Sequence, residues 1–156
     1  MNYDFSIRAD YLFGIYLLLS ILCSCDSQTS AVMYAAGKNS GELRAVLRHY
    51  SGDKEKKAAA LYLIDNMADK GEIRYDAAGR TEVIPDVSVI TADYLISNID
   101  LAFYAWKEYP WCRNLSFEEF CEEILPYRMR NEPLENWRGY YFNNISLSLT
   151  LWPHLI

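Results

Sequence analysis

Apolar residues recur along most of this chain at intervals of three and four, which is the spacing of one face of an α-helix. Several of these runs follow a residue that can cap a helix start, namely Ser40, Asp53, Thr91 and Ser116, with Glu119 completing a capping box after Ser116. The pattern predicts helices over residues 31–37, 40–50, 54–67, 91–109, 116–125 and 133–141. We therefore expect an all-α fold: one small domain of about five helices, with a loop over residues 72–89, where no period is sustained.

The apolar faces of these helices also predict the core. In the helix at 54–67, we expect the buried stripe to include Ala58, Leu61, Tyr62, Ile64 and Met67. Across the domain, the residues expected at the centre of the core are Leu47, Leu61, Ile64, Leu95, Phe103, Trp106, Phe120 and Leu125.

The C-terminal segment has a different pattern. Residues 145–152 alternate strictly between apolar and polar positions, a period typical of a half-buried strand. No other segment is an obvious partner strand, and a lone strand would leave a row of backbone groups unpaired. We therefore expect residues 143–156 to form an irregular or strand-like tail outside the helical domain.

The N-terminus has the pattern of a signal peptide. Twelve uncharged residues, 11–22, are too few for a helix that spans the roughly 30 Å hydrocarbon core of a membrane. Leu22 at −3 and Ser24 at −1 before Cys25 resemble the lipobox of bacterial lipoproteins, which implies that Cys25 is lipidated. We expect a signal peptide at 1–24, a tether at 25–30, a helical domain at 31–142 and the tail at 143–156. Two alternatives remain for residues 1–24: a buried apolar helix and an uncleaved membrane anchor.

Composition and charge narrow the class of protein. Apolar residues make up 51% of the 156 positions, which excludes a disordered tail. The net charge of −6 argues against nucleic acid as a partner, because such binding needs a basic face. A lipid anchor, rather than a basic patch, would hold the protein on a membrane, at the cell envelope.

Nucleophilic and metal chemistry find little support in the sequence. Cys121 lies on the apolar face of its helix, where a thiol packs as a small hydrophobe, while Cys112 follows a turn and is expected to be more exposed. A disulfide between them is an open alternative. His49 stands at a helix end and His154 in the tail, so neither has an evident thiol partner. No phosphate-binding glycine loop, CxxC or HExxH motif occurs, and we expect no cofactor, no metal site and no catalytic residue.

Two charged segments remain as candidates for binding. Four glutamates at 118, 119, 122 and 123 could pair for acid–base work or calcium binding, but a solvated helix face explains them better. Residues 127–138 interleave aromatic and charged groups, which suits either a ligand surface or a salt-bridged connection between helices. The candidate interaction residues in this segment are Tyr127, Arg128, Arg130, Glu132, Trp137 and Arg138.

Several stretches together resemble the N-terminal helical region of transglutaminase-like lipoproteins of gut Bacteroidota. The resemblance covers residues 31–142 and is most specific over 117–138; it rests on residues 34–43, 46–50, 59–67, 94–103, 115–128 and 131–138. In that family a papain-like core with catalytic Cys, His and Asp follows this region. None of those positions is matched here, so the resemblance implies a non-catalytic module, and we expect a truncated product of a longer gene.

Three interpretations of function remain. The first is a non-catalytic helical module of a transglutaminase-like cell-envelope lipoprotein. The second is a complete small lipoprotein that binds a glycan or a protein partner through surface aromatics. The third is an enzyme that uses Cys112 or Cys121 as its nucleophile. The sequence shows no evident base beside either thiol.

Overall fold

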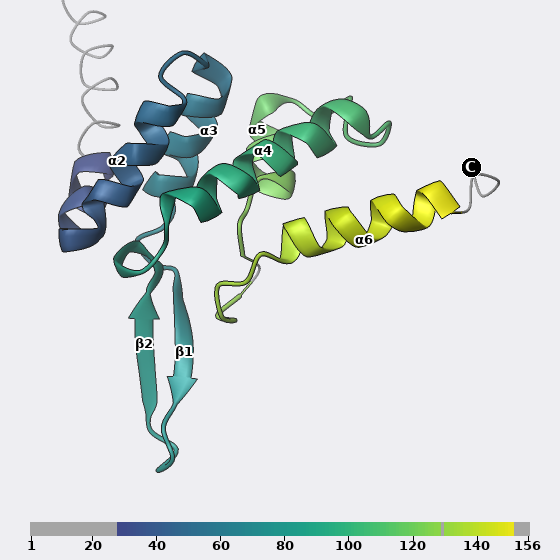
Figure 1. The fold of residues 1–156 in the computed structure, drawn as a ribbon. Helices are drawn as coiled ribbons and strands as arrows, with labels where there is room; N and C mark the ends of the chain where they lie inside the picture. The colour runs from purple at the N-terminus through teal and green to yellow at the C-terminus, as the bar shows by residue number, and fades with distance from the viewer. Residues whose placement is uncertain (1–27, 129, 152–156) are drawn as a thin grey trace, which may run out of the picture.

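The computed structural model describes residues 28–128 and 130–151, of which 145–151 are described by their backbone alone. Residues 28–35 are helical, and a group of helices packs around one core (Figure 1). In chain order the elements after this first helix are η1 (Gly37–Asn39), α2 (Ser40–His49), α3 (Lys54–Asp65), β1 (Gly71–Tyr75), β2 (Thr81–Pro85), η2 (Asp86–Ser88), α4 (Ala92–Glu108), α5 (Phe117–Glu119), η3 (Phe120–Ile124) and α6 (Trp137–Leu151).

Three of the four predicted helix caps are confirmed. The side chain of Asp53 accepts a hydrogen bond from the Lys56 amide at 3.0 Å, and that of Thr91 accepts one from the Tyr94 amide at 3.3 Å. At the start of α5, Ser116 forms a reciprocal capping box with its N3 residue, a glutamate. The prediction for α2 is wrong by one position, because Ser40 is the first helical residue and the preceding asparagine occupies the cap without a side-chain bond.

The expectation of an all-α fold is wrong, because the segment taken for a loop forms an antiparallel hairpin. Strand β1 pairs with β2 from Gly71↔Pro85 to Tyr75↔Thr81, so the molecule is a mixture of helices and a two-stranded sheet. Its turn depends on Gly79, whose φ of +76° favours glycine, and on the Asp76 carboxylate, which accepts two backbone N–H bonds. The hairpin projects away from the helices (Figure 1).

The tail prediction is wrong as well. Helix α6 runs from Trp137 through Leu151, so residues 143–151 continue a helix instead of forming a strand or an irregular segment. The side chain of Asn136 accepts a hydrogen bond from the Gly139 amide at 3.0 Å, which is the arrangement of an N-cap. Near its start α6 packs beside α4, where Phe142 meets the edge of Tyr104 at 5.0 Å between ring centroids.

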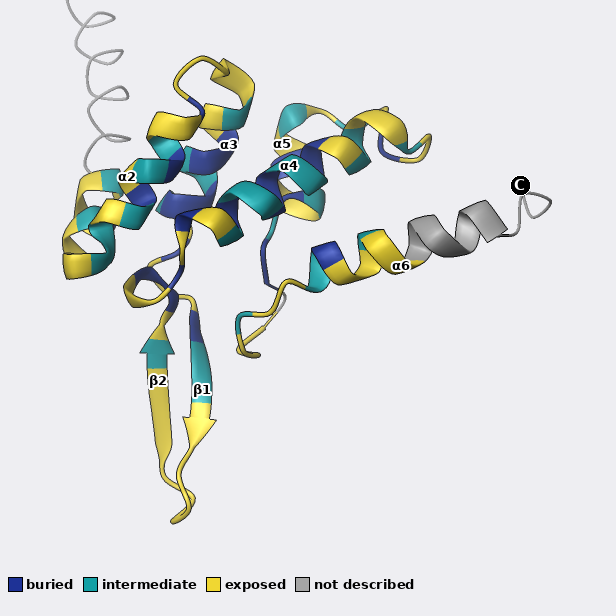
Figure 2. Ribbon diagram, in the orientation of Figure 1, coloured by how far each residue is buried: buried dark blue, intermediate teal, exposed yellow. Residues whose placement is uncertain are grey.

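The core lies between α2, α3, α4 and η3, and the buried positions gather on the facing sides of these helices (Figure 2). Five of the eight predicted core residues are fully enclosed: Ile64, Leu95, Phe103, Phe120 and Leu125. Leu47 and Trp106 are half-buried against the core, and Leu61 is only partly covered. In α3 the predicted stripe is partly wrong, because Ala59, Ala60 and Leu63 are buried where Ala58 is exposed.

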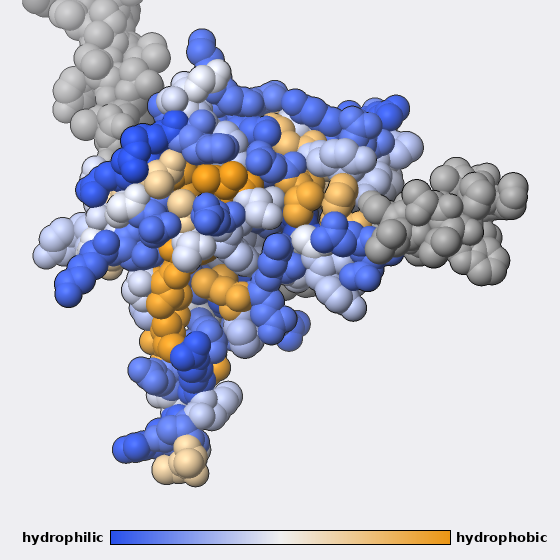
Figure 3. All heavy atoms as spheres, viewed as in Figure 1, coloured by the Kyte–Doolittle hydropathy of each residue, from blue (hydrophilic) through white to orange (hydrophobic). Residues whose placement is uncertain are grey.

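Hydrophobic side chains also gather where the hairpin joins the helices, whereas most of its tip is hydrophilic (Figure 3). The base of the hairpin is therefore part of the packed body, and only its outer half is surrounded by solvent. Among residues 28–128 and 130–151, no helix is both long enough and apolar enough to cross a membrane.

Candidate binding site

The segment between η3 and α6 is anchored to the hairpin by an enclosed group of polar side chains. The Arg128 Nε lies 2.8 Å from Oδ2 of Asp86, and the Tyr127 hydroxyl donates to the same oxygen at 2.8 Å. Arg128 also donates from one Nη to the carbonyl oxygens of Gly71 and Arg130, at 2.8 and 2.9 Å. One side chain therefore fixes this segment to the first residue of β1.

Arg138 forms a second anchor, at the start of α6. Its guanidinium donates to the side-chain oxygen of Asn98 at 2.9 Å and to the carbonyl oxygens of Ile124 and Pro126 at 2.6 and 3.1 Å. Asn98 in turn donates to the Leu125 carbonyl at 2.8 Å. Burial lowers the pKa of Arg138 to about 10, so the side chain is charged at neutral pH and complements the carbonyls at the end of η3.

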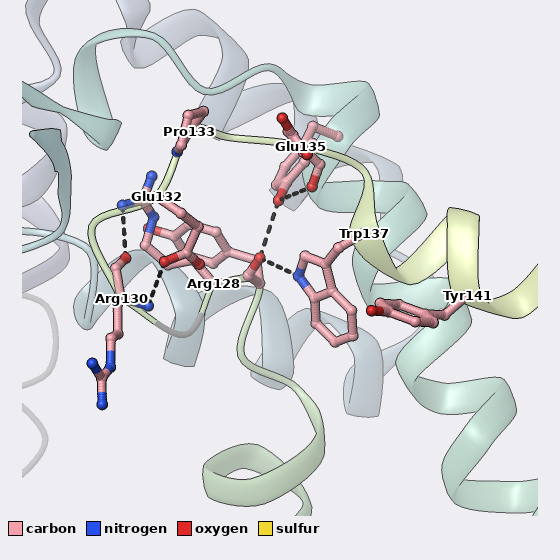
Figure 4. A pocket seen from close by; sticks show the side chains of 9 residues that line it. Arg128, Arg130, Glu132, Pro133, Glu135, Trp137 and Tyr141 are labelled. Carbon is pink, nitrogen blue, oxygen red and sulfur yellow. Dashed lines mark hydrogen bonds between the residues drawn. The ribbon is translucent and has the colours of Figure 1, made fainter. Parts of the chain in front are cut away.

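A third set of contacts surrounds the Tyr127 carbonyl oxygen. It accepts a hydrogen bond from the Trp137 Nε1 at 2.8 Å, and the Tyr94 hydroxyl lies 3.0 Å away (Figure 4). The same hydroxyl lies 3.1 Å from the Glu135 carbonyl. Because a hydroxyl has one proton, Tyr94 shares it between the two carbonyls. These contacts hold Trp137 and Tyr94 in place against the segment.

A pocket of about 400 Å³ opens between this anchored segment and α6 (Figure 4). Trp137 and Tyr141 stand together at one side, with their ring centroids 6.5 Å apart and their planes at 66°. Tyr141 is 56% exposed, so much of its ring is accessible. The other residues that line the pocket are Tyr94, Tyr127, Arg128, Arg130, Glu132, Pro133 and Glu135.

A smaller hollow of about 280 Å³ is lined by the same two rings. Tyr109 and Trp111 face it as a stacked pair, with centroids 5.9 Å apart and planes within 14° of parallel. Trp111 is 68% exposed. The hollow is also lined by Leu101, Ala105, Glu123, Ile124, Arg138 and Phe142.

Five of the six candidate interaction residues line the larger pocket: Tyr127, Arg128, Arg130, Glu132 and Trp137. Their roles differ, because Tyr127 and Arg128 are buried and anchor the segment, whereas Arg130 and Glu132 are exposed at the rim. Arg138 lines the smaller hollow and is occupied by backbone carbonyls.

Sequence reasoning missed Tyr94, Pro133, Glu135 and Tyr141. Tyr141 follows Trp137 by one helical turn, so the i, i+4 spacing was an available signal for it. Tyr94 lies far away along the chain and had no comparable signal.

The two described thiols are enclosed. Cys121 packs in the core as predicted, and burial, aided by the charge of Glu122, raises its pKa to about 11. Cys112 is fully buried, contrary to the expectation of exposure, and burial raises its pKa too. Both thiols are free, so the disulfide alternative is not formed.

The remaining candidates add no further site to the described part of the chain. His49 ends α2 and lies edge-on against the next tyrosine, at 4.7 Å between centroids. The four glutamates of α5 and η3 are exposed, as a solvated face would be, and Glu119 serves the capping box. No group of three or more potential metal ligands occurs among the residues described. Cys25 and His154 lie outside the described residues.

No family model matches the sequence, and no match is found among curated proteins or solved structures.

Proposed function

We propose that this chain is the non-catalytic binding module of a lipid-anchored cell-envelope protein, and that its ligand occupies the pocket beside Trp137 and Tyr141. The observation that carries the proposal is this pocket of about 400 Å³. Ligand pockets typically measure about 300–1,000 Å³ and combine apolar walls with a few polar groups that orient the ligand. Ring faces supply the walls here, and Arg130 and Glu132 supply charged groups at the rim.

The pocket is built before a ligand arrives. The segment that forms its wall is fixed at one end by Arg128 and at the other by Arg138, and Trp137 is held through its indole nitrogen. Side chains that are already ordered lose little conformational entropy on binding, which favours affinity. A wall segment that is hydrogen-bonded at both of its ends suits recognition of a ligand.

The proposal of a non-catalytic role draws support from the thiols. A nucleophilic cysteine needs a lowered pKa or an adjacent base, whereas burial raises the pKa of both Cys112 and Cys121. Kinship with the helical region of transglutaminase-like lipoproteins remains part of the proposal. It predicts that the isolated protein incorporates no amine into a glutamine peptide; activity that disappears in Cys121→Ala or Cys112→Ala would contradict it.

The binding proposal is tested by screening the protein against immobilised arrays of defined glycans and of peptides, followed by calorimetry in solution. Tyr141→Ala removes an exposed ring from the pocket wall and should reduce affinity for the ligand at least about tenfold. Tyr34→Ala is the control, because it removes a tyrosine that is even more exposed and does not line the pocket. Equal affinity of both variants and the wild type would exclude the pocket as the site.

The anchor is tested separately, in cells. We expect a fatty-acid probe supplied during growth to label the wild-type protein at Cys25 and to leave Cys25→Ala unlabelled. Cys23→Ala is the control, because Cys23 has the bulky Leu22 before it, where the lipobox pattern requires a small residue. Undiminished labelling of Cys25→Ala would contradict lipidation at this position.

A further inference from the structure

The two hollows share a wall. Trp137 and Tyr141 line both of them, so the larger pocket and the smaller hollow adjoin at one pair of rings, which we call the aromatic ridge. Beyond the smaller hollow the stacked rings of Tyr109 and Trp111 form a second aromatic surface. Aromatic rings therefore line both hollows, and two of them, Tyr141 and Trp111, are largely exposed.

We propose that the ligand of this face is a neutral linear oligosaccharide that lies across the ridge, with sugar units in both hollows. This proposal rests on the proposed function and deepens it by naming the class of ligand and a second subsite. The pocket beside Tyr141 holds one part of the glycan chain. The stacked Tyr109–Trp111 pair supports a later unit of the same chain.

The chemistry of the walls favours a sugar over a peptide. A peptide in an extended form is held largely through backbone hydrogen bonds, for which the site must offer free backbone groups. At the larger pocket several of these groups are already used. The Tyr127 carbonyl accepts from Tyr94 and Trp137, the Glu135 carbonyl lies within reach of the Tyr94 hydroxyl, and the Arg130 amide donates to Glu132 at 2.8 Å. What the site offers instead is ring faces with carboxylates and a guanidinium at the edge, which suit the apolar faces and the hydroxyl groups of sugars.

Charge favours a neutral glycan. Both signs occur at the rim of the larger pocket, in Arg130, Glu132 and Glu135, and Glu123 borders the smaller hollow. The other two cations in these linings are already paired: Arg128 with Asp86 and two carbonyls, and Arg138 with Asn98 and two carbonyls. With a net charge of −6 on the whole chain, a polyanionic glycan would be repelled.

The experiment compares a long and a short form of each of three neutral glycans. Cellohexaose, mannohexaose and N-acetylchitohexaose, each with its disaccharide, are titrated into the full chain, and binding is followed by calorimetry. We expect at least one hexasaccharide to bind about tenfold more tightly than its disaccharide, because only the longer ligand reaches both hollows. Trp111→Ala should remove most of this advantage, because it weakens the hexasaccharide more than the disaccharide, whereas Tyr141→Ala should weaken both.

The control is Tyr75→Ala, which removes an exposed ring from the hairpin and should change neither affinity. Far-UV spectra and melting curves establish that each variant is folded. Equal affinity for hexasaccharide and disaccharide, or no effect of Trp111→Ala, overturns the second subsite and leaves the proposed pocket standing. If none of the three hexasaccharides binds, the inference is overturned. Binding of an arrayed peptide that depends on Tyr141 would then still support the proposed function. If no arrayed glycan or peptide binds either, both proposals are contradicted.

Discussion

The guanidinium of Arg128 and the carboxylate of Asp86 form an ion pair of 2.8 Å whose side chains are only 4% and 0% exposed. Both charges have been removed from water, and this costs free energy that their attraction must offset. Burial raises the pKa of Asp86 despite the Tyr127 hydrogen bond and the charge of Arg128, which both act to lower it. The pair therefore fixes the position of the binding segment at an energetic cost.

Removal of one member should be more harmful than removal of both. Arg128→Met leaves a buried carboxylate without its cation, and we expect a loss of about 3–5 kcal/mol in the free energy of unfolding, measured with urea. In the double variant Asp86→Asn with Arg128→Met, no charge is stranded, so the loss should be smaller than for Arg128→Met alone. Arg74→Met is the control, because the Arg74 side chain is exposed and its pair with Glu72 should contribute little to stability. Equal losses in Arg128→Met and Arg74→Met would contradict this account.

Arg138 should contribute to stability through hydrogen bonds to backbone carbonyls. Arg138→Met leaves the carbonyls of Ile124 and Pro126 without their donor, and the expected loss is about 1.5–3 kcal/mol in the same urea measurement. Arg113→Met is a matched control: Arg113 also donates to carbonyls at the end of a helix, but at 3.3 Å and in solvent. Arg113→Met should change the free energy of unfolding by no more than about 0.5 kcal/mol. A comparable loss in both variants would show that burial of Arg138 is not what matters.

The base of the hairpin should tolerate no side chain at Gly71. A Cβ there would lie 2.8 Å from the carbonyl oxygen of Ile84 and 3.1 Å from a methyl group of Val83. We expect Gly71→Ala to lower the melting temperature, at a cost of about 1–3 kcal/mol for overpacking. Gly41→Ala, in open space within α2, should be neutral or stabilising by up to about 1 kcal/mol. A neutral Gly71→Ala would indicate that the two strands can separate without cost.

The thiol of Cys121 makes stability depend on pH in the alkaline range. Its pKa in the folded protein is about 11, above the ordinary value of 9.0, because burial disfavours the thiolate. This contribution to stability is fully present below pH 9 and is lost as the pH rises toward 11, since the unfolded chain ionises first. The stability of the wild type relative to Cys121→Ala should therefore fall between pH 9 and 10.5. A difference that stays constant over this range would contradict an enclosed thiol.

Sequence reasoning succeeded where a local rule decides the structure. The caps at Asp53, Thr91 and Ser116 depend on hydrogen bonds between neighbours in the chain, and each was recognisable from residue type and spacing. The placement of Cys121 followed from helical periodicity alone. Cys112 was mispredicted because its burial depends on how the turn after α4 folds back, which no periodicity describes.

The errors occur where distant contacts decide. Residues 72–89 were read as a loop because Gly79 and Pro85 interrupt the pattern, although the first forms the turn and the second ends the edge strand. The alternation after Ile145 is typical of a strand, but it lies within a helix that begins eight positions earlier at Trp137. The pocket was predicted in part. Most of its lining residues lie in one continuous segment that the sequence singled out, whereas Tyr94 reaches the pocket from α4 through tertiary packing.

The bond from Arg128 to Gly71 joins segments 57 residues apart in the chain, so the hairpin and the wall of the pocket share one support. A second bond, from the Ile73 amide to the Asn131 carbonyl at 3.2 Å, continues this junction. Local opening of a protein proceeds in cooperative units rather than residue by residue. Amide protons at the base of β1 and in the segment around Asn131 should accordingly exchange with deuterium at a common rate, and a ligand that closes the pocket should slow exchange in a hairpin it never contacts.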